Sequence, residues 1–250
     1  MLNFTHVFVG IGKAGGSVVD GIESDVVKVR INPGYYILRT GTYSEKIASF
    51  FSRLPENSLV WIVFEDKPVN VEIVGLISEN LPEGTMGLAY VFTPSRELFE
   101  ESKPSWAKNF ETVFYDSLWE FLKRDVPLLE AYEEASVVIS RALTLLHRSL
   151  EGQMVINVDY ADFFSTVRGG NVGILRLLSR IDFDWHWGVW DRGIVITIVD
   201  EGVALRDAHA VLQRFHDLLK EKDIIWGLVS RKTAGTGIET LTLLVRKWGE

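Results

Sequence analysis

Short apolar runs alternate with amphipathic stretches along the first half of the chain. The apolar runs have the length of strands and cover residues 4–9, 26–31, 59–64, 87–92 and 111–115, with a shorter candidate strand at 35–39. Helical periodicity marks residues 44–54 and 69–81. Continuous apolar runs are typical of strands buried on both faces of a parallel sheet, and the strand–helix–strand order favours right-handed crossovers. The first half of the chain is therefore expected to form a Rossmann-like parallel sheet.

The longest periodic stretch, residues 127–150, predicts one long helix with a broad apolar face that begins at Leu128 and Leu129. Beyond Gly152 the pattern changes. Strand-like runs at 172–178, 193–199, 224–230 and 239–246 surround one helical stretch at 205–220, and an aromatic cluster at 186–190 is typical of a hairpin edge. We expect an α/β chain with a parallel-sheet N-terminal domain at 1–125, a central helix at 126–152 and a smaller α+β C-terminal domain at 153–250.

Composition narrows the classes of function. Hydrophobic residues make up 47% of the 250 residues, which is ample for a packed core. The net charge of −8 gives no electrostatic case for a nucleic-acid partner. The absence of cysteine excludes disulfides, zinc–thiolate sites and a cysteine nucleophile.

Metal and membrane binding have little support in the sequence. The five histidines form no H-x-x-x-H pair, so no metal site is expected; they are His6, His147, His186, His209 and His216. No apolar run reaches the ~18 residues that a membrane-spanning helix needs. No signal peptide is visible at the N-terminus. We therefore expect a soluble cytoplasmic protein.

A glycine-rich segment follows the first apolar run. It contains Gly10, Gly12, Lys13, Ala14, Gly15 and Gly16, and three of its glycines fit the pattern G-x-G-x-x-G. A strand, a glycine turn and a helix start let backbone N–H groups face a phosphate at the helix N-terminus. Glycines at these positions also serve tight packing between a strand and a helix. The pattern alone leaves both interpretations open.

A second polar group follows the long helix. Asn157, Asp159 and Asp162 lie between two apolar stretches, and the two aspartates are three residues apart. A helix that starts here places both carboxylates on one face. The alternative is an ordinary helix N-cap, for which Asn and Asp are favoured residues.

These motifs, in this order, resemble those of the tubulin/FtsZ superfamily. Residues 9–16, Val-Gly-Ile-Gly-Lys-Ala-Gly-Gly, resemble its first phosphate loop, and residues 127–135 resemble the start of its central helix. Residues 156–162, Ile-Asn-Val-Asp-Tyr-Ala-Asp, resemble its catalytic loop. Residues 195–199 and 224–228 resemble strands of its C-terminal domain.

The resemblance implies a cytoskeletal or cell-division protein that binds GTP or GDP, with Mg²⁺ as a further candidate cofactor. Its subunits would stack head to tail, on copies of the chain or on an FtsZ- or tubulin-like protein. The glycine segment, Thr93 and Tyr132 would contact the nucleotide, with Tyr132 available to stack on the base. Asn157 would contact the nucleotide of the next subunit, and Asp159 and Asp162 would hold the attacking water or its metal.

The chain departs from the family where the second phosphate loop is expected. The family's G-G-G-T-G-T-G segment should follow residues 59–64, but Glu-Asp-Lys-Pro-Val-Asn stands at 65–70. Two carboxylates there would repel phosphates, and Lys67 could offset part of that repulsion. Ser136 stands near the position of the aspartate that reads guanine, and Asp116 near that of an expected asparagine.

Three functions follow from these patterns. The chain is a divergent GTP-binding filament protein with GTPase activity, or a non-hydrolysing homologue that caps or regulates filaments of a true FtsZ. The third is a Rossmann-type enzyme with a dinucleotide, although no Asp or Glu ends the run at 26–31 to hold a ribose. Whether the chain is an enzyme stays open at this point.

Overall fold

The computed structural model describes residues 4–34, 40–95, 102–121, 126–152, 156–178, 189–231 and 237–249. The expected strand at 35–39 and most of the expected hairpin edge at 186–190 lie outside these ranges. None of the helices in the described part of the chain combines the length and the apolar character that crossing a membrane requires.

Nine strands of the described residues form one sheet in the order β2-β1-β3-β4-β5-β6-β9-β7-β8. The strands are β1 Thr5–Ile11, β2 Val27–Ile31, β3 Ser58–Glu65, β4 Met86–Thr93, β5 Thr112–Ser117, β6 Asn171–Leu178, β7 Arg192–Asp200, β8 Asp223–Arg231 and β9 Ile238–Lys247. Every pair from β2 to β6 is parallel. β9 runs antiparallel to both β6 and β7. The predicted parallel first half is confirmed.

A short pairing joins the two halves of the sheet. β5 and β6 pair only from Thr112 opposite Asn171 to Phe114 opposite Gly173. The strands expected in a separate α+β part thus extend the same sheet. The division of the chain into domains at 125 and 152 stays a prediction.

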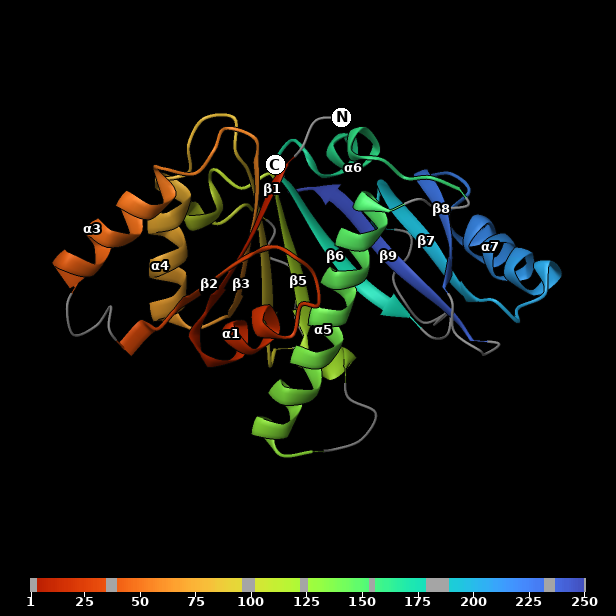
Figure 1. Cartoon of the computed structure of the whole chain (residues 1–250), viewed down its shortest axis with the longest axis horizontal. Helices are drawn as coiled ribbons and strands as arrows, with labels where there is room; N and C mark the ends of the chain where they lie inside the picture. The colour runs from red at the N-terminus through yellow and green to blue at the C-terminus, as the bar shows by residue number, and fades with distance from the viewer. Residues whose placement is uncertain are drawn as a thin grey trace.

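Helices cover both faces of the sheet (Figure 1). They are α1 Gly12–Asp20, α3 Thr40–Phe51, α4 Pro68–Glu79, α5 Leu128–Glu151, α6 Tyr160–Val167 and α7 Leu205–Leu219, with single 3₁₀ turns at Ser105–Ala107 and Leu118–Glu120. Alternate residues of β3 point to opposite faces. Leu59, Trp61 and Val63 pack with α1, α5 and α6. Val60, Ile62 and Phe64 pack with α3 and α4.

Helix α5 lies across both halves of the sheet. Its buried residues Ile139, Leu143 and Leu146 belong to one apolar cluster that also contains residues of β1, β3, β7 and β9. The predicted burial was wrong at the first turn, where Leu128 is 60% and Leu129 is 58% exposed. The described strands do not reach this turn, which projects beyond the sheet (Figure 1). Helix α5 thereby connects two distant edges of the molecule.

Candidate functional site

The glycine segment forms the sharp turn from β1 into α1. Gly12 has a φ of 76°, a conformation that favours glycine. A Cβ on Gly10 would lie 2.3 Å from the Gly15 carbonyl oxygen, and one on Gly15 would lie 2.2 Å from the Val63 oxygen. Gly10 and Gly15 therefore let α1 pack directly on β1 and β3. The packing interpretation accounts for these two glycines without a ligand.

An internal carboxylate lies at the N-terminus of α1. The backbone N–H of Ala14 donates to Glu65 Oε1 at 2.9 Å. Glu65 ends β3 and is only 3% exposed. The first turn of α1 contains no acidic residue of its own, so the anion comes from the neighbouring strand. A helix N-terminus attracts anions through its free N–H groups and its dipole, and here Glu65 supplies that anion.

Two neighbours hold Glu65 in this position. Lys67 forms an ion pair with its second carboxylate oxygen. The buried Asn70 side chain donates to the Glu65 carbonyl at 3.0 Å. A Cβ on Gly12 would lie 3.2 Å from the side-chain amide nitrogen of Asn70. Residues 65–70, which stand in place of the second phosphate loop, therefore pack against the glycine segment.

The remaining nucleotide candidates lie at the same edge or beside it. Tyr132 is partly buried, and Lys67 Nζ lies 5.7 Å from the centre of its ring. Burial raises the pKa of Tyr132, and the nearby Glu65 and Asp66 raise it further. Thr93 is buried, and its hydroxyl accepts a hydrogen bond from the Ser95 N–H.

Lys13 and Gly16, the remaining residues of the glycine segment, differ in their surroundings. Lys13 is exposed, whereas Gly16 faces the side chain of Arg30. Both positions are compatible with an anion nearby, and neither requires one. The role of the glycine segment, Thr93 and Tyr132 in nucleotide binding stays a prediction.

The two positions expected near a base have partners within the protein. Asp116 is fully buried and accepts hydrogen bonds from Tyr90 Oη and Arg176 Nε, both at 2.5 Å. Burial raises the pKa of Asp116, and the positive charge of Arg176 opposes that shift. Ser136 donates to the Tyr132 carbonyl one turn earlier on α5. Asp116 is thus hydrogen-bonded within the core, and Ser136 is hydrogen-bonded within α5.

Residues 156–162, the acidic loop, are fixed at their start by β8. Ile156 and Leu228 form an antiparallel bridge with backbone hydrogen bonds of 3.2 and 3.1 Å. Val158 is buried against Gly227, where a Cβ would lie 2.9 Å from the valine side chain. This contact turns the neighbouring Asn157 outward, and Asn157 is exposed.

Asp159 and Asp162 form a capping box at the start of α6. The Asp162 N–H donates to Asp159 Oδ1 at 2.9 Å, and the Asp159 N–H donates to Asp162 Oδ2 at 3.1 Å. The N-cap interpretation of the sequence is therefore confirmed. Asp159 is exposed and Asp162 is half-buried, so both carboxylates still reach the surface. A cap and a role toward a partner are compatible, and the catalytic role stays a prediction.

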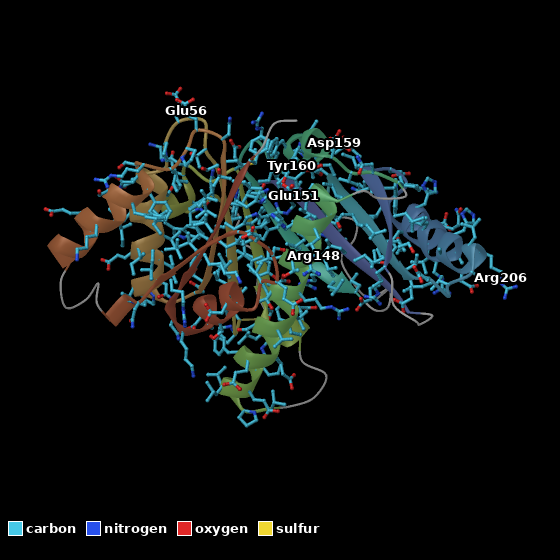
Figure 2. All side chains as sticks on the ribbon, viewed as in Figure 1. Glu56, Arg148, Glu151, Asp159, Tyr160 and Arg206 are labelled. Atoms are coloured by element: carbon cyan, nitrogen blue, oxygen red, sulfur yellow. The ribbon has the colours of Figure 1, made fainter. Side chains whose placement is uncertain are left out.

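The two candidate groups lie at opposite ends of α5. Tyr132, in the second turn of the helix, is near Lys67 and the glycine segment, whereas Glu151 at its last turn is hydrogen-bonded to Tyr160 of α6. The 24 residues of α5 correspond to a helix roughly 36 Å long. Figure 2 shows Asp159 and Tyr160 beside the end of α5 that carries Glu151. The acidic loop cannot reach the glycine segment of its own chain.

A further polar cluster adjoins the acidic loop. His6 Nε2 lies 2.5 Å from the Tyr160 hydroxyl and 3.5 Å from Glu151 Oε1, and the ring of His147 lies edge-on to that of His6 with centroids 4.4 Å apart. Burial and the adjacent His147 lower the pKa of His6 to about 4. Burial also lowers the pKa of His147 and raises that of Tyr160. Both imidazoles are therefore neutral at pH 7.

Sequence reasoning missed this cluster. The histidines have no metal-binding spacing to one another, so no metal site was expected. The H-x-x-x-E spacing of His147 and Glu151 on a predicted helix was the available signal. His6 joins them only through the fold.

Solved structures with the same arrangement of elements identify the fold. No protein-family model matches the chain. An FtsZ dimer of M. jannaschii superposes with a TM-score of 0.72 over 98% of this chain and 88% of that one, at 16% identity. The chain has the tubulin/FtsZ fold.

One further solved structure shares this fold, and one protein is similar in sequence. The GTPγS-bound protofilament of CetZ2 from Haloferax volcanii has a TM-score of 0.65 over 98% of this chain and 94% of that one, at 12% identity. In sequence, cell division protein FtsZ 2 of Pyrococcus furiosus is 20% identical over 146 residues. That match spans 52% of this chain and 36% of the relative.

Proposed function

We propose that this chain is a cytoskeletal, filament-associated protein of the tubulin/FtsZ type that acts on the nucleotide of a partner subunit and holds none in its own glycine segment. The observation that carries the proposal is the hydrogen bond from the Ala14 N–H to the buried Glu65 carboxylate. That carboxylate lies at the end of α1 where a phosphate would bind. A phosphate entering there would have to displace Glu65 and break its pair with Lys67.

The opposite edge of the molecule is suited to contact such a partner. Asn157 and Asp159 are exposed, and the capping box fixes the direction of both carboxylates. Fixed carboxylates near a γ-phosphate can orient an attacking water, usually with a metal ion that offsets their charge. CetZ2 of Haloferax volcanii is found as a GTPγS-bound protofilament, which is consistent with a GTP-holding partner of this fold.

Two charge-neutral variants test the proposal. FtsZ 2 of Pyrococcus furiosus is assembled with GTP and Mg²⁺, the chain is added, and sedimentation and phosphate release are measured. We expect co-sedimentation and a change in GTP turnover of severalfold. Asp159→Asn and Asp162→Asn keep an oxygen for each capping hydrogen bond and should lose the effect on turnover. Absence of binding and of any change in turnover would contradict the proposal.

A second candidate is a divergent filament protein that binds GTP itself. The observation in its favour is Lys67, whose side chain is 56% exposed at the glycine segment and could pair with a phosphate after Glu65 moves. Under this alternative, the chain alone binds GTP and sediments with it. The same sedimentation assay without FtsZ 2 distinguishes the two candidates.

A further inference from the structure

Three potential metal ligands converge where β1, α5 and α6 meet. His147 and Glu151 are four residues apart on α5 and share one face of the helix. His6 reaches them from β1. One donor atom from each of these residues lies within 4.8 Å of the other two. The cluster is separate from the glycine segment and from the carboxylates of the capping box.

The distances suit a small divalent ion. Zinc is bound by histidine nitrogens and carboxylate oxygens at about 2.1 Å, so tetrahedral ligand atoms lie about 3.4 Å from one another. His6 Nε2 and Glu151 Oε1 are already 3.5 Å apart. The donor atom of His147 lies within 4.8 Å of both of these atoms.

The hydrogen bonding of His147 is the second observation. Its Nδ1 is buried and has no hydrogen-bond partner among the described residues. A buried nitrogen without a partner is unfavourable, because it loses its hydrogen bond to water. A metal ion would use such a lone pair, either at Nδ1 or at Nε2 after a turn of the ring.

The third observation is a cavity at the same place. It has a volume of about 800 Å³, and His6, His147 and Glu151 contribute to its lining together with Glu23, Asp25 and Arg148. An ion held by three protein ligands keeps a fourth position for water or for another ligand. The cavity gives that position access to solvent.

We infer that His6, His147 and Glu151 form a binding site for a divalent transition-metal ion, with Zn²⁺ as the best match to two imidazoles and one carboxylate. Tyr160 is the residue that yields when the ion binds. Its hydroxyl donates to Glu151 and lies 2.5 Å from His6 Nε2, so it occupies two atoms that the ion requires. Tyr160 is also the first residue of α6 and follows the Asp159 cap. Displacement of its hydroxyl by the ion would therefore act directly on the start of α6.

Isothermal titration of the full chain with Zn²⁺ tests the site, with Co²⁺ absorption as a second readout. We expect one ion per chain, and we expect His147→Ala and Glu151→Gln each to weaken binding by roughly 10–100-fold or more. His209→Ala, on the distant helix α7, is the matched control and should bind as the wild type does. Mg²⁺ should not compete, because it prefers oxygen ligands.

Tyr160→Phe separates the site from a nonspecific one. Phenylalanine preserves ring packing against Phe4 and Phe164 and removes only the competing hydroxyl. We expect this variant to bind Zn²⁺ severalfold more tightly than the wild type. Failure of the wild type to bind Zn²⁺, or equal binding by His147→Ala and the wild type, would overturn the inference.

Discussion

The backbone N–H of Ala14 and the carboxylate of Glu65 are joined by a hydrogen bond of 2.9 Å at the first turn of α1. This contact joins a glycine turn that resembles a phosphate loop to a strand end that departs from the family. Because Glu65 is buried and paired with Lys67, its negative charge is fixed at the position that a phosphate would need. Under the proposed function, the same residue stabilises the fold and closes the predicted nucleotide site.

Removal of Glu65 should reduce stability. Glu65→Ala leaves the buried Ala14 N–H without its acceptor, which costs about 1–3 kcal/mol. Glu65→Gln retains an oxygen that can accept this hydrogen bond, so its loss should be smaller. Urea unfolding followed by circular dichroism measures both, and equal stability of Glu65→Ala and the wild type would show that the contact contributes nothing.

Gly15 should tolerate no side chain. A Cβ there would lie 2.2 Å from the Val63 carbonyl oxygen, so Gly15→Ala forces α1 away from β3 and should cost about 3 kcal/mol or more. Gly41 in α3 is the matched control, because a Cβ added there would meet nothing within 4 Å. Gly41→Ala should stabilise the helix by about 0.5–1 kcal/mol. Thermal unfolding of the two variants compares them, and similar melting temperatures would contradict this account of the glycine segment.

The capping role of Asp159 can be separated experimentally from any role of its negative charge. Asp159→Ala removes the acceptor for the Asp162 N–H and should destabilise the protein by about 1 kcal/mol, whereas Asp159→Asn should be nearly neutral. If the carboxylate also acts on a partner, Asp159→Asn loses the effect on GTP turnover while keeping its stability. An Asn variant with full effect on turnover would leave Asp159 with a capping role alone.

Arg176 should be essential to the folded state. It is buried and donates to Asp116 at 2.5 Å, so Arg176→Met leaves a buried carboxylate without its main counter-charge and should cost about 3–5 kcal/mol. The double variant with Asp116→Asn removes that charge and should recover part of the loss. Denaturant unfolding of the single and double variants tests the coupling, and additive effects would argue against it.

Much of the fold could be predicted from local pattern. The continuous apolar runs at 59–64 and 87–92 lie within β3 and β4, and the periodic stretch at 127–150 became α5. The N-cap was also visible, because Asp159 and Asp162 have the spacing of a capping box. These features depend on neighbouring residues, which is why the sequence alone reveals them.

Other features depend on residues far apart in the chain. His6 and Tyr160 are separated by 154 positions, and Asp116 and Arg176 by 60. Leu128 and Leu129 continue the apolar pattern of α5, but no described strand lies beneath them, so they are exposed. Sequence pattern predicts which residues can be buried, whereas tertiary structure decides which neighbour each one meets.

Whether Glu65 excludes nucleotide from the glycine segment is tested most directly by equilibrium binding of GTP and GDP. The purified wild-type chain is used, in the presence of Mg²⁺. Because Glu65 holds the phosphate position, we expect no saturable binding by the wild type at micromolar nucleotide. Glu65→Ala should show a measurable gain, provided that circular dichroism shows it to be folded. Stoichiometric micromolar binding of GTP by the wild type, unchanged in Glu65→Ala, would contradict the account.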